Sequence, residues 1–212
     1  MSRKTILLLT SLIYLLPHAA SCAAWEVTNS VRVEHGTLRI DHSKSMAEIT
    51  RAQAKGGFPA KYGLGLFQNG VKTELLFEAP ETALATRRLK LSTRILTTPI
   101  IYVAREFPVD SCAYRAVIDH EMLHQLFDLE VLRAMPDEVR AITRLVFSPD
   151  ELDWARPLDL ERARKRFFQQ YKYVYDALSL PRHQRIDNPE SYRRLSRLCN
   201  GEITRLLAGK QP

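Results

Sequence analysis

The sequence predicts an α+β fold, with an antiparallel sheet in a strand-rich first half and helices in the second half. Short segments of alternating apolar and polar residues run as far as residue 104. From residue 108 onward the apolar residues recur at helical spacing instead. No low-complexity linker separates the halves, so we expect one domain at residues 24–212, with a strand-rich part at 24–107 and a helical part at 108–212.

The strand-rich part contains five segments with strand character: residues 25–33, 37–40, 62–67, 71–77 and 83–104. The first two flank a predicted turn at His35-Gly36. The next two flank Asn69-Gly70, a pair that accepts the positive φ of a tight turn and therefore predicts a hairpin. Pro99 interrupts the last segment, which could be one strand or two.

Five segments are predicted to be helices: residues 45–54, about 110–134, 136–146, 158–178 and 189–207. Asp110 or Ser111 can cap the second helix, because a short polar side chain can accept hydrogen bonds from the first free backbone N–H groups. That helix is expected to stop before Pro136, which lacks the N–H that a helix interior requires.

His120, Glu121 and His124 form an H-E-x-x-H motif inside the second predicted helix. Residues four apart lie on one face of a helix, so both imidazoles can reach one metal ion. Seven apolar residues project onto the same half of the helix as the histidines: Ala113, Ala116, Val117, Leu123, Phe127, Val131 and Ala134. Two inward histidines would need separate buried polar partners, whereas a shared metal satisfies both.

The chemistry of this motif favours zinc. Zinc binds neutral imidazole, and a catalytic zinc site has three protein ligands and a fourth position for water. The bound water loses a proton near neutral pH, and a carboxylate beside it can accept that proton. We therefore expect one catalytic Zn²⁺ on His120 and His124, with Glu121 as the general base.

The first residues of the chain predict export. Arg3 and Lys4 precede an apolar run at residues 6–16, and a small-residue stretch follows. This is the layout of a secretory signal peptide, which we assign to residues 1–23. No later segment is long enough for a transmembrane helix. The mature protein is expected in the periplasm or outside the cell.

The cysteines fit an oxidising compartment. Cleavage before Cys22 would resemble bacterial lipoprotein processing, but Ala19 stands where a larger aliphatic residue is usual, so a lipid anchor at Cys22 is not favoured. Either outcome leaves Cys112 and Cys199 as a pair in the exported chain. Exported proteins rarely keep free thiols, so we expect a disulfide between these two cysteines.

The charge pattern argues against a nucleic-acid partner. The formal charge of +7 falls to +5 when loss of the predicted signal peptide removes Arg3 and Lys4. Acidic and basic residues alternate along much of the chain, and no basic run is interleaved with stacking aromatic residues. Weak attraction to an anionic envelope polymer fits this charge.

Strands followed by a long helix with H-E-x-x-H, and by further helices, resemble the catalytic core of zincin metallopeptidases. The chain is also similar to exported bacterial proteins classed as metallopeptidases, in which cysteines recur shortly before the motif and near the C-terminus, as Cys112 and Cys199 do. The resemblance covers about residues 99–200 and rests on one specific motif. It implies a peptide or protein substrate that pairs, in extended form, with the last strand before the helix at residues 100–105.

The third zinc ligand departs from the zincin patterns. One zincin branch places a histidine or an aspartate after a turn-permitting glycine, but Phe127 and Glu130 occupy those positions. The expected disulfide would hold the segment before the last helix near the motif. We therefore expect His183 to be the third ligand or an oxyanion donor, with Asp187 and Glu190 as alternatives.

Together these features predict an exported zinc peptidase that uses a metal-activated water. The alternative is a non-catalytic envelope protein with a structural metal site or none, whose basic surface binds anionic envelope components. A third interpretation is an amidase or glycan-directed hydrolase with the same metal in a different cleft. Neither the substrate nor the oligomeric state follows from the sequence.

Overall fold

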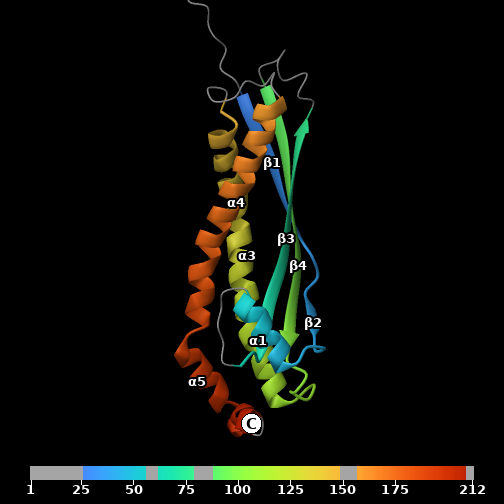
Figure 1. Ribbon diagram of the computed structural model, residues 1–212, viewed down its shortest axis with the longest axis vertical. Helices are drawn as coiled ribbons and strands as arrows, with labels where there is room; N and C mark the ends of the chain where they lie inside the picture. The colour runs from blue at the N-terminus through green and yellow to red at the C-terminus, as the bar shows by residue number, and fades with distance from the viewer. Residues whose placement is uncertain (1–25, 56–61, 79–87, 149–156, 209–212) are drawn as a thin grey trace, which may run out of the picture.

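The computed structural model describes residues 26–55, 62–78, 88–148 and 157–208, and the predicted signal peptide lies outside this described part. The molecule is long and narrow, and its long strands and helices run side by side along one axis (Figure 1). The strands are β1 (Glu26–His35), β2 (Arg39–Asp41), β3 (Gly65–Glu78) and β4 (Arg88–Val103). The helices are α1 (Met46–Lys55), α3 (Cys112–Val146), α4 (Pro157–Ile186), α5 (Pro189–Arg197) and α6 (Glu202–Ala208), with a 3₁₀ turn at Cys199–Gly201.

The sheet is built around β4. β1 and then β2 pair with one edge of β4 in parallel, and β3 pairs with the opposite edge in antiparallel orientation. The predicted α+β fold with an antiparallel sheet is therefore wrong, because β1 and β2 both run parallel to β4 and only β3 runs antiparallel to it. Residues 100–102 are paired on both edges, so they cannot also pair with an extended substrate.

Neither of the glycine-containing turns predicted in the sheet reverses the chain. β3 runs straight through Asn69-Gly70, and the chain continues past Gly36 in the direction of β1. Each glycine is needed for close approach to β4: a Cβ on Gly70 would lie 2.4 Å from the Thr98 hydroxyl oxygen, and one on Gly36 would lie 2.3 Å from the Thr97 carbonyl oxygen. The glycines thus allow tight pairing and do not reverse the chain.

Prolines interrupt the elements less than the sequence predicted. Pro99 lies inside β4, at the gap between the pairing of β1 and that of β2. Pro136 lies inside α3, so the two helices predicted on either side of it are one continuous helix. Met135 and Val139 flank Pro136 and are fully buried in one apolar cluster. Such burial offsets the roughly 3 kcal/mol that a proline costs inside a helix.

The C-terminal helices also differ from the prediction. α4 continues to Ile186, about two turns beyond the predicted end at Leu178. The helix predicted at 189–207 is divided at Cys199 and Asn200, whose φ angles of 58° and 53° are not helical. This longer α4 and the break after α5 determine which side chains reach the centre of the molecule.

The expected disulfide between Cys112 and Cys199 is confirmed. It joins the first turn of α3, which Ser111 caps by accepting a hydrogen bond from the Tyr114 N–H, to the turn between α5 and α6. The two cysteines are 87 residues apart, and a disulfide that closes such a long loop contributes roughly 2–4 kcal/mol. The C-terminal helices are thereby held at the start of α3.

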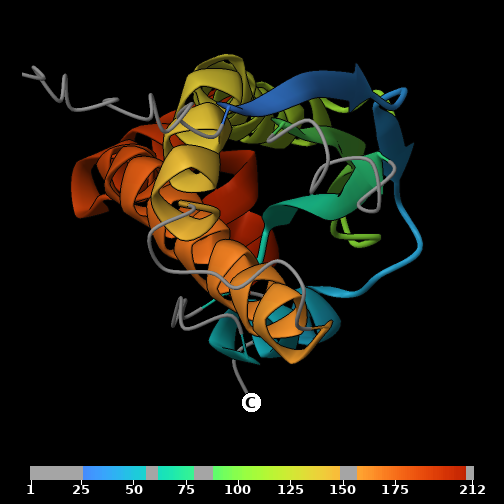
Figure 2. The same ribbon diagram turned by 90° about the horizontal axis from the view of Figure 1, so that it is seen from above.

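α3 packs on one face of the sheet, and α4 returns antiparallel to it (Figures 1 and 2). Two apolar clusters fill the interior. We call the one around Met135, Phe147 and Phe167 the distal core, and the one around Ile101 and Phe107 the proximal core. Among the described residues no helix is long and apolar enough to cross a membrane.

Candidate metal centre

The H-E-x-x-H residues lie on α3 between the two apolar clusters. His124 is 5% exposed and Glu121 6% exposed, and the apolar side of this stretch is largely buried as predicted. Leu123 is an exception, because it is 45% exposed although the helical projection put it on the inward half. The buried surface of α3 therefore changes here from apolar to polar.

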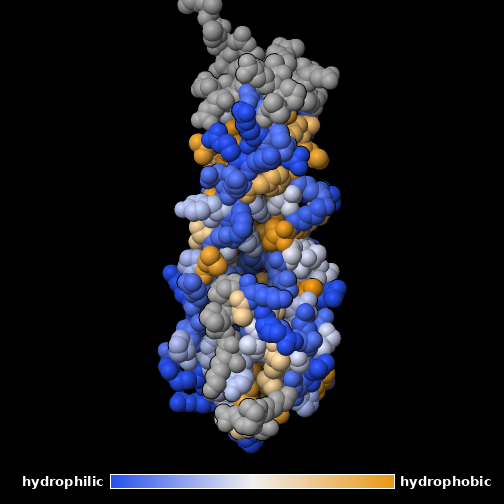
Figure 3. Space-filling view, in the orientation of Figure 1, coloured by the Kyte–Doolittle hydropathy of each residue, from blue (hydrophilic) through white to orange (hydrophobic). Residues whose placement is uncertain are grey.

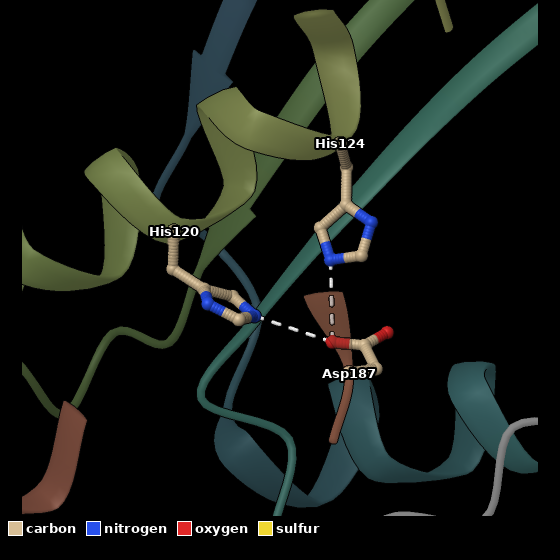
Figure 4. A group of neighbouring side chains, drawn as sticks. All are labelled: His120, His124 and Asp187. Carbon is tan, nitrogen blue, oxygen red and sulfur yellow. Dashed lines mark hydrogen bonds and ion pairs between the residues drawn. The ribbon is translucent and has the colours of Figure 1, made fainter. Parts of the chain in front are cut away.

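Asp187 brings the two histidines together. The Nε2 atoms of His120 and His124 each lie 3.2 Å from the same carboxylate oxygen, Oδ1 of Asp187, in the turn that follows α4 (Figure 4). The three ligand atoms all lie within 4.8 Å of one another. Two imidazole nitrogens and a carboxylate oxygen at this separation could hold a metal ion.

The electrostatics of the group keep Asp187 ionised. Burial alone would raise the pKa of the Asp187 carboxyl, but the hydrogen bonds and charges of the two imidazoles hold it well below its usual range. Burial lowers the pKa of His120. The hydrogen bond to Asp187 and the negative charges of Glu121 and Asp187 outweigh burial, so the pKa of His120 is raised overall. The Tyr192 hydroxyl also donates to Asp187 Oδ1, at 3.1 Å.

Glu121 is held against β3. Its Oε2 accepts a hydrogen bond of 2.7 Å from the backbone N–H of Phe67, and burial raises the pKa of the carboxyl. A Cβ on Gly65 would lie 2.7 Å from Glu121 Oε1 and 2.6 Å from a methyl group of Val117. Gly65 therefore lets the helix and the strand approach closely enough for the Phe67 N–H to fix the carboxylate.

The other predicted ligands occupy different positions. His183 lies in the last turn of α4, and its Nδ1 is 2.8 Å from Nδ1 of His124, the ring nitrogen that does not contact Asp187. Burial lowers the pKa of His183, and so does the charge of His124. Glu190 is exposed in the first turn of α5. The structure thus brings Asp187, and neither His183 nor Glu190, to the two Nε2 atoms.

A cavity of about 260 Å³ opens beside the group and is lined by residues from α1, β3, α3 and α4. His124, Glu121, Asp187 and His183 contribute to its wall. A bound ion could therefore be reached from the cavity, an arrangement typical of ligand-binding sites with a few convergent polar groups.

Three other polar residues of the cavity wall have roles that the sequence analysis did not identify. Asp128 is 2% exposed and accepts hydrogen bonds from the Tyr175 hydroxyl and the Asn69 amide. Asn69 was predicted to lie in a hairpin turn. One signal was available: His120, His124 and Asp128 follow one another at four-residue intervals along one helical face.

Comparison with known proteins gives no match to a family model, to a curated protein or to a solved structure. A functional assignment for this chain therefore rests on its own residues and their geometry.

Proposed function

We propose that the protein is an exported, zinc-dependent peptidase in which His120, His124 and Asp187 hold the metal. The observation that carries the proposal is the approach of both Nε2 atoms to one Asp187 oxygen beside a buried glutamate. Two imidazoles and a carboxylate are an established donor set for catalytic zinc. Structural zinc sites usually have four protein ligands, whereas this group has three in the described part of the chain.

Each side chain has a distinct task in this proposal. Bound zinc would lower the pKa of a water molecule and polarise the scissile carbonyl group. Glu121 then accepts a proton from the attacking water and transfers it to the leaving amine. The Phe67 N–H holds one oxygen of Glu121 in place, so the carboxylate meets the substrate in a fixed orientation. Tyr192 and both imidazoles orient Asp187.

The substrate would enter along β3. The edge of β3 that faces away from β4 carries no other strand among the described residues, and Leu66 to Asn69 line the cavity. The Phe67 N–H and the Gly65 carbonyl are already bonded to Glu121 and Gln53, so a peptide would pair with the other backbone groups of this edge. An unpaired strand edge can bind an extended peptide through main-chain hydrogen bonds. Export is supported by the signal-like first 23 residues and by the Cys112–Cys199 disulfide, which suits an oxidising compartment.

The test begins with metal analysis of the purified mature protein. We expect about one zinc per chain. Glu121→Gln should keep the zinc and abolish cleavage of a casein or quenched-peptide substrate, because it removes the proton acceptor and retains the side-chain shape. Asp187→Ala should lose the zinc. A protein that purifies without metal and gains none at micromolar zinc contradicts the proposal, and a zinc protein whose Glu121→Gln form stays active excludes the proposed mechanism.

A further inference from the structure

The cavity beside the metal group has a second polar wall, on the side of the distal core. Asp128, Asn69 and Tyr175 line it. The volume of about 260 Å³ is just below the roughly 300–1,000 Å³ of small-molecule sites, which suits a single side chain of a larger substrate.

Asp128 is a buried carboxylate whose hydrogen-bond donors are neutral. The Tyr175 hydroxyl donates to its Oδ1 at 2.5 Å, and the Asn69 amide donates to its Oδ2. These contacts fix the carboxylate but leave its charge without a counter-charge. A buried charge that is hydrogen-bonded but unpaired costs several kcal/mol, so an incoming cation would be favoured here.

The charges around Asp128 agree with this. The residues lining the cavity include three carboxylates, Glu121, Asp128 and Asp187, with two imidazoles and neither lysine nor arginine. Asp128 belongs to no ion pair within the described ranges, and Arg133, which lines a neighbouring cavity with it, forms none with it. Asp128 is not part of the group that could hold the metal, because it lies about 6 Å further along α3 than His124.

A neighbouring oxygen is an acceptor without a donor. The Asn69 amide N–H donates to Asp128, which fixes the orientation of the Asn69 side chain. The remaining oxygen, Oδ1 of Asn69, is buried and has no partner among the described residues. A cationic ligand with several N–H groups would bind Asp128 and donate to this oxygen as well.

We propose that this wall is a substrate subsite for a basic side chain, and that the enzyme selects peptides with lysine or arginine beside the scissile bond. The proposal rests on the peptidase function. A lysine or arginine side chain reaches about 6 Å, which matches the separation of Asp128 from His124 along α3. Asp128 supplies the charge, and Asn69 supplies a further acceptor. Specificity for the cation follows because a neutral side chain would leave these groups unpaired.

The test measures binding separately from cleavage. The probes are pools of N-acetylated, C-amidated octapeptides with lysine, or its uncharged analogue norleucine, fixed at one position at a time. They are titrated into zinc-loaded, full-length mature protein carrying Glu121→Gln. For at least one position we expect lysine to bind tenfold or more tightly than norleucine. Adding Asp128→Asn should remove this preference, and adding Tyr175→Phe, which frees Oδ1 of Asp128 for the ligand, should increase it severalfold.

Equal binding of lysine and norleucine in every pool, or no binding at all, overturns the proposal. A lysine preference that persists in Asp128→Asn also overturns it. Asp128 would then only connect α3 to β3 and α4 through its hydrogen bonds with Asn69 and Tyr175. If Asp128→Asn does not fold, an unchanged preference in Tyr175→Phe has the same meaning. The zinc-loaded protein that retains Glu121 is tested for cleavage of the same peptides. Lysine-selective binding without any cleavage would contradict the proposed peptidase function and support the subsite alone.

Discussion

A single helix, α3, supports two different kinds of interior. Over residues 131–146 its buried side chains are apolar apart from Thr143, and they pack on the sheet and on α4. Over residues 120–128 the buried side chains are Glu121, His124 and Asp128. On the face that Figure 3 shows, polar side chains are interspersed with apolar ones along this axis. The contrast concerns the buried side chains.

The difference between the two stretches shows where stability and function reside. Apolar burial stabilises in proportion to area, about 25 cal/mol per Å², and depends little on direction. Buried polar groups stabilise only when each has its partner, and an orphan costs roughly 1–3 kcal/mol. The three buried ionisable residues within residues 120–128 cost folding free energy that an apolar stretch would not. Such a cost is expected of a site kept for chemistry.

The largest effect on stability is expected in the distal core. Phe167 is fully buried and packs on Phe147, so Phe167→Ala should lower the free energy of unfolding by about 3–5 kcal/mol. Tyr173 on the same helix is 71% exposed, and Tyr173→Ala should change it by less than about 0.5 kcal/mol. Urea titration measures both values. If the distal core and the metal group are independent, folded Phe167→Ala keeps its zinc. A folded Phe167→Ala variant without zinc would show that the two regions are coupled.

A smaller effect is expected from the disulfide. Replacing Cys112 and Cys199 by serine should lower the free energy of unfolding by about 2–4 kcal/mol. It should also weaken zinc binding, because the disulfide holds the turn next to α5, which carries the Tyr192 that donates to Asp187. Urea titration and zinc titration with a competing chelator give the two quantities. Unchanged zinc affinity in the serine variant would assign the bond to the fold alone.

The sequence was most informative where one helix settles the geometry. His120, Glu121 and His124 could be placed on one capped helical face because four-residue spacing is a local property. The cysteine pair followed from the compartment, since exported chains rarely keep free thiols. Both inferences need no knowledge of how distant segments pack.

The sequence was least informative where distant segments decide. Asn69-Gly70 has strong turn propensity, but pairing along the whole of β4 overrides it and uses Asn69 to reach Asp128. Asp187 was predicted only as an alternative to His183, and the predicted end of α4 was two turns too early. Each extra residue rotates the chain by about 100°, so the end of the helix decides which residue faces the metal group.

The smallest predicted effect tests whether His183 is a metal ligand, as the sequence predicted, or a residue that orients His124. If its Nδ1 accepts the Nδ1–H of His124, it fixes the tautomer that leaves the His124 Nε2 lone pair free for the metal. Losing such an orienting contact weakens metal binding about 10- to 100-fold. His183→Ala should therefore lose that factor, and His183→Asn, whose carbonyl oxygen replaces Nδ1, should recover most of it. The exposed neighbour supplies the control, Gln184→Ala, which should bind zinc normally. Zinc titration of the three variants measures the change in affinity. Complete loss of zinc in both His183 variants, together with retention of zinc in Asp187→Ala, would show that His183 is a ligand and that Asp187 is the orienting residue.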